Sequence, residues 1–539
     1  MESIAKGLFA GCVESDSLVP YPKLGDEERE TVAFLLDAFR KFAKENINAE
    51  KIDQEHKIGA EIIKGLGEMG IMGMTVPEAY GGFGFTPSQY GRVLEEMTRV
   101  CASTAILVGA HQSIGYKGIV LGGSEEQKHQ WLPLLAAGER LAAFALTEPE
   151  AGSNASGVKT VAKYDAARKG YVLNGTKQWI TNGGLAHTIT TLAKTGEESA
   201  LTAFIITSDM PGFSVGKEER KLGLKGSSTA QLIYENMFVP EANLLGRKGR
   251  GFLLFMEVLD TGRMGLAASC LGGCKEMIKQ AYEFASRRKQ FDTVVGEYEM
   301  IRHKFARMAA YTYASESMVY LSTGMVAKGL KDYSTESCLC KFYITEVLWN
   351  VINDALQVAG GNGYMQEYPF ERYLRDARIN LIFEGTNEIT RMFGATLGLR
   401  QTQKASKGSA GPHGDLAWAP DGLKAECAEL LDLIRKFGDF NKALLDKHGA
   451  GIKDREYHLE RIADIAAGLY AAVATLSRTV EEVKQKPEAL TYCRAFLHFE
   501  LPRMRQLLEF DFAATDNLRT AVSDHLYSKG GYPFDRWEI

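Results

Sequence analysis

The chain has 539 residues, of which 45% are hydrophobic and 24% charged, and its formal net charge at pH 7 is −5. This length supports more than one domain and a large hydrophobic core. Lys and Arg are interspersed with Asp and Glu, so the sequence shows no basic stripe of the kind that follows a phosphate backbone, and nucleic acid is not expected as a partner.

The eight cysteines indicate no metal site. Cys270 and Cys274 form one close pair and Cys338 and Cys340 another, but neither pair is followed by a second pair at the spacing of a zinc site. Most of these residues are expected to be buried as small hydrophobic side chains in a reducing compartment.

Neither a secretion signal nor a membrane span is predicted. Residues 1–10 contain one lysine and no apolar stretch of signal-peptide length. The longest apolar run, residues 462–476, contains Asp464 and is shorter than the roughly 18 to 20 residues that cross a bilayer. We expect a soluble or peripheral membrane protein, cytoplasmic in a bacterium or on the matrix side of the mitochondrion in a eukaryote.

Residues 1–26 are expected to form an N-terminal arm, and residues 27–142 a helical domain with a Gly-rich loop at 80–85. Apolar residues recur in this domain at helical spacing: Val32, Leu35, Leu36, Phe39 and Phe42. Gly115 and Gly118 interrupt a later helical run, where each costs about 1 kcal/mol relative to alanine. They indicate either close helix packing or a void left by the missing side chains.

The pattern changes to strands over residues 143–247, which predict a β-domain. Asn174-Gly175 stands between apolar-rich runs and predicts a tight hairpin. Residues 200–206 and 231–239 predict further strands.

Three small residues near the start of the β-domain indicate a site for a planar ring. Thr147 and Ser153 offer hydroxyl groups, and Gly152 lets the backbone approach closely, an arrangement that suits the hydrogen-bonding edges of such a ring. Trp179, taken alone, is instead expected in the core of the sheet, because large aromatic side chains are commonly buried there.

Long helical patterns return over residues 248–402 and predict a helical bundle, interrupted at residues 290–296. Arg288 and Phe291 lie at the end of one helix, and the glycines of residues 360–363 end another. Taken alone, such an arginine is usually a solvated cation and such a glycine cluster a C-terminal helix stop.

Glu384 is the candidate catalytic residue, in a loop between two predicted helices. Ile382 and Phe383 precede it and Gly385 follows, so a carboxyl group lies in apolar surroundings beside a backbone that a ligand can approach closely. Burial raises the pKa of a carboxyl group, which suits a general base. The alternative is that Glu384 caps the next helix, where an acid is favoured by the helix dipole.

Residues 403–418 are small and polar and predict a linker, and residues 419–539 predict a C-terminal helical domain. The apolar run at 462–476 has few basic residues to attract anionic lipid, so docking on the rest of the chain is expected ahead of membrane contact. The fold class is therefore α+β, mostly helical: a helical domain, a β-domain, a four-helix-bundle domain and a C-terminal helical extension.

Four stretches, in the right order, resemble the acyl-CoA dehydrogenase family over residues 20–400. These stretches are residues 377–390 around Glu384, residues 146–153, residues 178–181, and residues 288–291 with 357–363. Gly115 with Gly118, together with the helical extension, is similar to the very-long-chain subgroup of the family, in which the missing side chains would leave room for a long acyl chain.

The resemblance implies FAD-dependent dehydrogenation of a long-chain fatty acyl-CoA to trans-2-enoyl-CoA, the first step of fatty acid β-oxidation. Glu384 would remove the α-proton while flavin N5 accepts the β-hydride. The thioester carbonyl would be polarised by a flavin ribityl hydroxyl and the backbone N–H of Glu384. Some relatives carry their base at the position of Gly262, so a glycine there leaves Glu384 as the candidate.

The resemblance also implies the ligand contacts. FAD would be held by Phe144, Leu146, Thr147, Gly152, Ser153, Trp179, Ile180, Thr181, Arg288, Phe291, Gln357, Gly360, Gly361, Thr386 and Glu388. The substrate would contact Gly115, Gly118, Ser153, Asp260, Arg263, Phe383 and Gly385, with Arg263 near the CoA end. Asp292 and Glu299 depart from the glycine and glutamine that the family usually has at the adenosine end.

The implied partners are an acyl-CoA, an electron-transferring flavoprotein as electron acceptor, and a second copy of the chain. In the family Arg288 and residues 357–361 serve the FAD of a neighbouring subunit, so a homo-oligomer, a dimer at least, is expected. Two alternatives share this fold: an acyl-CoA oxidase that passes electrons to oxygen, and a protein that helps to assemble a respiratory complex.

Overall fold

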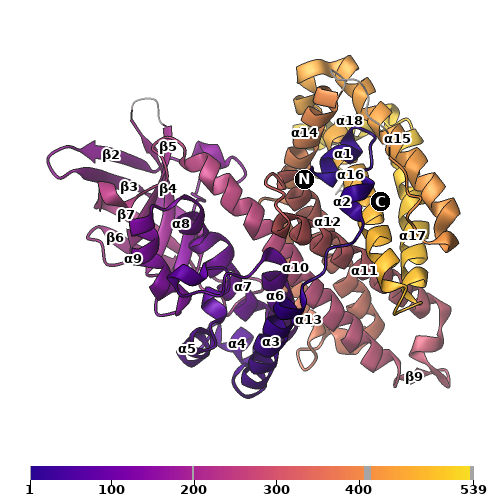
Figure 1. The fold of residues 1–539 in the computed structure, drawn as a ribbon, viewed down its shortest axis with the longest axis horizontal. Helices are drawn as coiled ribbons and strands as arrows, with labels where there is room; N and C mark the ends of the chain where they lie inside the picture. Colours follow the sequence, from indigo (N-terminus) through magenta and orange to yellow (C-terminus); the bar gives the residue numbers. More distant parts are fainter. Residues whose placement is uncertain (1, 197–199, 406–413, 535–539) are drawn as a thin grey trace.

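The computed structural model describes residues 2–196, 200–405 and 414–534. In Figure 1 a twisted sheet and short helices form one side of the molecule, and long helices fill the other side, where both described ends of the chain lie. The predicted α+β, mostly helical architecture is confirmed. Within the described ranges no helix combines the length and apolar character needed to cross a membrane.

The N-terminal arm is folded onto the helical side of the molecule. It forms two short helices, α1 (Ile4–Phe9) and α2 (Ser15–Leu18), which the sequence analysis did not predict. The carbonyl oxygen of Phe9 accepts hydrogen bonds from Thr402 Oγ1 at 2.7 Å and from Asn441 Nδ2 at 3.0 Å. The arm is therefore fixed to two helices whose contact residues follow it by 393 and 432 residues.

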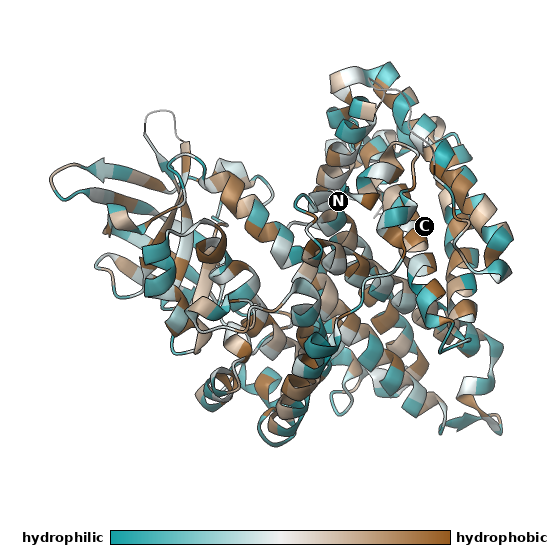
Figure 2. Cartoon of the chain, viewed as in Figure 1, coloured by the Kyte–Doolittle hydropathy of each residue, from teal (hydrophilic) through white to brown (hydrophobic). Residues whose placement is uncertain are grey.

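The next part of the chain is helical, as predicted. Its helices are α3 (Asp26–Asn46), α4 (Ala49–Glu55), α5 (Ala60–Glu68), α6 (Pro87–Val100), α7 (Ala102–Gly109), a π-helix (Ala110–Gly115), α8 (Lys117–Gly122) and α9 (Glu125–Ala136). Helix α3 buries Val32, Leu35 and Phe39 at the predicted spacing. In Figure 2 hydrophilic and hydrophobic residues alternate along these helices, as expected when one face of each helix is buried.

The void predicted at Gly115 and Gly118 is wrong. A Cβ atom at Gly115 would lie 2.8 Å from the Cβ of Ala142 in the first strand, and one at Gly118 would lie 3.3 Å from Leu245 Cδ2. Both glycines therefore allow helix and sheet to pack closely, which was the other reading of the pattern.

One sheet of eight strands forms the β-domain in the described residues. The strands are β1 (Ala142–Ala145), β2 (Val161–Asp165), β3 (Gly170–Thr181), β4 (Thr188–Thr195), β5 (Ala200–Thr207), β6 (Phe213–Glu218), β7 (Thr229–Pro240) and β8 (Leu244–Leu245). Their order is β6-β7-β3-β2-β4-β5-β8, and β1 pairs in parallel with β4. Helices α8 and α9 and the start of the next helix cover one face of this sheet.

The hairpin predicted at Asn174-Gly175 is wrong, because both residues lie inside the continuous strand β3. The pairing register of β3 with β7 shifts between Leu173 and Gly175, which marks a β-bulge. A Cβ atom at Gly175 would lie 2.4 Å from Thr160 Oγ1 on the neighbouring segment. Glycine thus serves the bulge and the close backbone approach instead of a turn.

Long helices build the rest of the molecule: α10 (Gly251–Ala285), α11 (Glu299–Ala327), α12 (Ser334–Ala359), α13 (Phe370–Ala377), α14 (Asn387–Ala405), α15 (Lys424–His448), α16 (Glu456–Glu482), α17 (Ala489–Glu509) and α18 (Ala513–Lys529). A short hairpin, β9 (Lys289–Gln290) and β10 (Thr293–Val294), interrupts the bundle near the predicted place. Half of the predicted linker, residues 406–413, lies outside the described residues.

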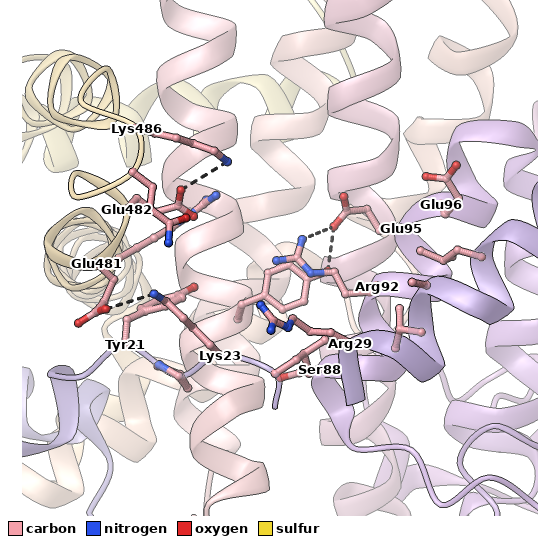
Figure 3. A pocket seen from close by; sticks show the side chains of 18 of the residues that line it. Tyr21, Lys23, Arg29, Ser88, Arg92, Glu95, Glu96, Glu481, Glu482 and Lys486 are labelled. Carbon is pink, nitrogen blue, oxygen red and sulfur yellow. Dashed lines mark hydrogen bonds and ion pairs between the residues drawn. The ribbon is translucent and has the colours of Figure 1, made fainter. Parts of the chain in front are cut away.

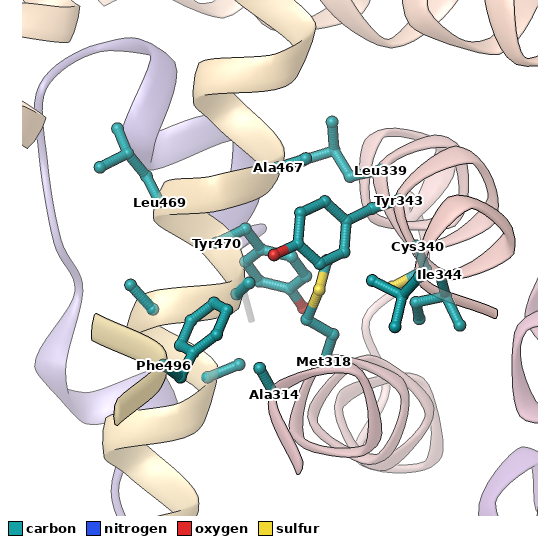
Figure 4. Close-up of a cluster of buried hydrophobic side chains, with 14 of the residues drawn as sticks. Ala314, Met318, Leu339, Cys340, Tyr343, Ile344, Ala467, Leu469, Tyr470 and Phe496 are labelled. Atoms are coloured by element: carbon teal, nitrogen blue, oxygen red, sulfur yellow. The ribbon is translucent and has the colours of Figure 1, made fainter. Parts of the chain in front are cut away.

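Helices α15, α16 and α17 share one hydrophobic core with the bundle, so the expected docking is confirmed for them. Figure 4 shows Tyr470 of α16 and Phe496 of α17 packed against Met318 of α11 and Tyr343 of α12. The apolar run at 462–476 is buried almost throughout. Seven of the eight cysteines are buried free thiols, which confirms the prediction for most of them.

Candidate active site

The loop that carries Glu384 connects α13, with the 3₁₀ turn Arg378–Leu381 that follows it, to α14. Glu384 has a φ of 59° and Gly385 a φ of 89°, so two successive residues adopt the left-handed conformation. Glycine takes this conformation freely, but a glutamate does so at an energetic cost and only where its surroundings hold it. Strain of this kind is concentrated at functional sites.

The Glu384 carboxyl group has the properties of a general base. Its Oε2 atom is buried and has no hydrogen-bond partner within the described part of the chain. Burial raises the pKa of Glu384 to about 7, although Arg263 and Lys341 pull it down. The higher pKa agrees with the sequence prediction, and the capping alternative fails because Thr386 Oγ1 accepts the Ile389 N–H at the start of α14.

Two buried cations hold the backbone of this loop. Arg263 of α10 donates from Nε to the carbonyl oxygen of Glu384 at 3.1 Å, and Lys341 of α12 donates from Nζ to the carbonyl oxygen of Gly385 at 2.6 Å. Arg263 is only 5% exposed and also pairs with Asp260 at 2.8 Å. Arg263 thus holds the backbone of the loop and Asp260 holds Arg263; their contacts with the substrate stay a prediction.

Gly262 leaves the space that the Glu384 carboxyl group needs. A Cβ atom at this position would lie 2.8 Å from Glu384 Oε2 and 2.8 Å from Ile114 Cγ2. Ile114, from the π-helix, and the carboxyl group therefore border the same small space beside Gly262. Sequence reasoning missed Ile114 and Lys341, because neither belongs to a motif and the burial of a lysine becomes visible only in the fold.

Trp179 does not lie in the core of the sheet, where it was expected when considered without the family resemblance. Its side chain is 58% exposed, and its φ of 57° is left-handed. The N–H of Gln178 donates to the carbonyl oxygen of Thr147 at 2.9 Å, so the two predicted cofactor segments lie side by side. An exposed indole beside the half-buried Thr147 presents a flat aromatic surface with polar groups at its edge.

A buried ion pair fixes these two segments to each other. Lys177 Nζ lies 2.7 Å from Glu148 Oε1 and also donates to the carbonyl oxygen of Leu146 at 3.2 Å. Glu148 accepts further hydrogen bonds from Thr160. Both charged side chains are almost completely enclosed, so the pair supports the surface without belonging to it.

The other residues predicted to contact the flavin ring differ in their exposure to solvent. Gly152, Ser153 and Glu388 are exposed, and Thr181 and Thr386 partly so. Phe144, Leu146 and Ile180 point into hydrophobic clusters, so their side chains are not available to a ligand. Nothing lies within 4 Å of the place where a Cβ atom of Gly152 would stand, so the backbone there is open. The residues present thus fit the planar ring system of FAD.

The predicted adenosine-end residues lie on the helical side of the molecule. Phe291 is 91% exposed with a φ of 50°, and Arg288, Gln357, Gly360 and Gly361 are exposed as well. Figure 1 shows β9, which follows Arg288, at the opposite end of the molecule from the strands that carry Trp179. The two sets of residues therefore lie on opposite sides of one chain.

A cavity of about 580 Å³ lies elsewhere, between the N-terminal arm, α3, α6 and α16 (Figure 3). Its acidic residues are already paired with bases: Glu481 with Lys23 at 3.1 Å, Glu96 with Arg40 at 2.7 Å, and Glu95 with Lys275 of α10 at 2.5 Å. None of the residues that line it belongs to the Glu384 loop. Ion pairs therefore line this cavity, and it is not the site of the reaction.

Family models cover most of the chain. The N-terminal, middle and C-terminal domains of acyl-CoA dehydrogenase match residues 29–139, 143–237 and 249–397. The ACAD9/ACADV C-terminal domain matches residues 421–497.

Individual proteins agree with these models. Human mitochondrial very long-chain specific acyl-CoA dehydrogenase is 36% identical over 90% of this chain and 80% of its own length. An acyl-CoA dehydrogenase of Bacillus subtilis is 40% identical over 66% of this chain and 94% of its own. The crystal structure of an acyl-CoA dehydrogenase complexed with FAD from Bacillus anthracis superposes with a TM-score of 0.84 at 31% identity, covering 96% of this chain and 94% of that one. The chain therefore belongs to the acyl-CoA dehydrogenase family of FAD-dependent enzymes.

Proposed function

We propose that the protein oxidises long-chain fatty acyl-CoA thioesters to trans-2-enoyl-CoA in the first step of β-oxidation, with Glu384 as the catalytic base. The observation that carries the proposal is the buried, unpaired Oε2 of Glu384 in a strained loop, with a pKa of about 7. A base of this pKa is about half ionised near neutral pH and can take a proton that is weakly acidic.

In this reaction Glu384 Oε2 accepts the α-proton of the substrate, and the backbone N–H of Glu384 donates to the thioester carbonyl as negative charge develops there. Ile114 borders the carboxyl group and would help to exclude water from it, which strengthens these interactions. FAD, when bound, supplies the acceptor for the β-hydride. Trp179 and the backbone around Thr147 and Gly152 would hold its ring system, and Thr386 and Glu388 would contact it from the Glu384 loop.

Two lines of support favour a long acyl chain. The human very long-chain enzyme aligns over 90% of this chain, and the C-terminal helices match the ACAD9/ACADV domain. The glycines at 115 and 118 give no such support, because both positions are packed. Phe383, Gly385 and Ser153 remain the proposed substrate contacts near the reacting carbons.

The working protein is proposed to be a dimer or a larger oligomer. The adenosine end of FAD would be bound by residues on the helical side: Arg288, Phe291, Gln357, Gly360 and Gly361. The ring of that FAD would lie on the sheet of a partner subunit, because Figure 1 shows the two regions at opposite ends of one chain. An exposed phenylalanine such as Phe291 would be buried by that contact. An electron-transferring flavoprotein is the proposed acceptor of the electrons.

The test is anaerobic mixing of the purified flavoprotein with saturated acyl-CoAs of graded length, followed by the bleaching of the flavin absorbance. Bleaching that is fastest with long chains supports the proposal, and re-oxidation by an electron-transferring flavoprotein without oxygen consumption identifies a dehydrogenase. Rapid oxygen consumption during turnover would instead identify an oxidase. No bleaching with any chain length would leave an assembly role as the better account.

A further inference from the structure

Lys341 is a buried lysine without an acidic partner. Its side chain is 0% exposed in the middle of α12. No carboxylate oxygen among the described residues lies within ion-pair distance of its Nζ; the atoms it contacts are the carbonyl oxygen of Gly385 at 2.6 Å and Asn387 Oδ1 at 2.7 Å. A buried cation normally requires a charged partner to offset its desolvation. Lys341 is instead placed against two neutral oxygens at the two ends of one short segment.

Asn387 connects this lysine to the beginning of α14. Its Nδ2 donates to Glu346 Oε1 at 3.0 Å, and Glu346 pairs with Arg391 at 2.6 Å. Lys341 and Glu346 both belong to α12, so the last loop residue and the first turn of α14 are fixed to one helix. The loop has little freedom to relax at this end.

Arg263 holds the other end of the same segment from α10. The carbonyl groups of two successive left-handed residues thus point to two cations on two different helices, while Glu384 Oε2 is left unpaired. The two cations differ, because the charge of Arg263 is partly balanced by Asp260 whereas that of Lys341 is not. Lys341 therefore acts on Glu384 both through the backbone and through an uncompensated positive charge.

We propose that Lys341 is a positioning residue of the reaction: its ammonium group holds the 384–387 segment in the strained conformation that leaves Glu384 Oε2 free for the substrate. This inference rests on the proposed role of Glu384 as the base. Lys341 does not touch the substrate and works only through the loop.

The charge has a consequence for pH dependence. The groups that act on Glu384 are Arg263, Lys341 and Tyr90. The groups that interact with Lys341 are Glu384, Arg263, Cys270, Glu346, Cys338 and Glu388. Lys341 lowers the pKa of Glu384 against the effect of burial. Removing the positive charge leaves burial less opposed, so the pKa of Glu384 must rise.

The test compares Lys341→Met, which removes charge and donor, with Lys341→Gln, which removes the charge but keeps a donor. Both variants should lose about 10- to 100-fold in the rate of flavin bleaching with little change in KM, because misplacement of a reacting group costs rate more than binding. The acidic limb of the pH–rate profile should move to higher pH in both, and Lys341→Gln should recover part of the rate.

A readout that does not depend on turnover is infrared titration of the Glu384 carboxyl band, with Glu384→Gln as the subtraction reference. Lys275→Met is the matched control, because Lys275 pairs with Glu95 and Glu316 in the bundle; it should lower stability without moving the titration. The inference is wrong if the wild type bleaches its flavin and the Lys341→Gln variant shows the same bleaching rate and the same titration of the Glu384 carboxyl group. A wild type that fails to bleach refutes the proposed function instead.

Discussion

Gly262→Ala tests the space around the proposed base directly. The added Cβ atom would lie 2.8 Å from both Glu384 Oε2 and Ile114 Cγ2 and 3.2 Å from Glu384 Cδ. Ordinary contact begins at about 3.4 Å, so the carboxyl group and Ile114 must each move by about 0.6 Å. Overpacking of this kind costs about 1 to 3 kcal/mol of stability, and a shift approaching 1 Å costs about 10- to 100-fold in rate.

The assay is the anaerobic rate of flavin bleaching by a saturating acyl-CoA, together with the melting temperature of the flavoprotein. Gly273→Ala is the matched control on the same helix: its Cβ atom would lie 2.9 Å from Leu348 Cδ1, a similar overlap far from any carboxyl group. The account predicts that both variants lose stability and that only Gly262→Ala loses rate. Equal rates for the two variants would refute the reasoning.

Three further outcomes are expected. The rate of flavin bleaching should fall about tenfold per pH unit below pH 7, because the Glu384 pKa is raised to about 7 and only the ionised form accepts a proton. A stopped-flow profile in which this rate stays flat to pH 5 would contradict the prediction. Glu148→Gln should lower the free energy of unfolding in urea by about 3 to 5 kcal/mol and weaken FAD retention, because Lys177 then stays buried without its anionic partner. Unchanged stability would show that the Lys177–Glu148 pair is not needed to hold the fold. Truncation after Gly408 should lower the melting temperature or solubility, because it exposes the face of α11 and α12 that carries Met318 and Tyr343, and a truncated protein as stable as the full chain would contradict docking.

Periodicity and motifs predicted the helical regions, the sheet and the Glu384 loop, because these depend on local hydrophobic pattern or on residue types at fixed positions. Local signals failed where distant chain segments decide the conformation. Asn174-Gly175 has the composition of a turn, but pairing with β7 keeps the strand continuous. Gly115 could not be assigned to packing until Ala142 was placed against it.

The residues that support the site could not be predicted either, because their roles depend on contacts with distant parts of the chain. Lys341 reads in the sequence as one more helical lysine, and only the fold brings it to Gly385 across 44 residues. Trp179 taken alone was expected in the core, whereas the family resemblance implied a contact with FAD; the structure leaves its side chain 58% exposed on a left-handed backbone. The short helices of the N-terminal arm depend on partners such as Thr402 and Asn441, which no local pattern can reveal.

The central claim is that Glu384 is the base, and Glu384→Gln tests it most directly, because an amide keeps the shape of the side chain and cannot accept the α-proton. The variant should retain its FAD and bind acyl-CoA, as shown by an unchanged visible spectrum and by ligand-induced perturbation of that spectrum. Its anaerobic bleaching by a long-chain acyl-CoA should be at least about 100-fold slower than that of the wild type. Bleaching at the wild-type rate would contradict the account and require a different base.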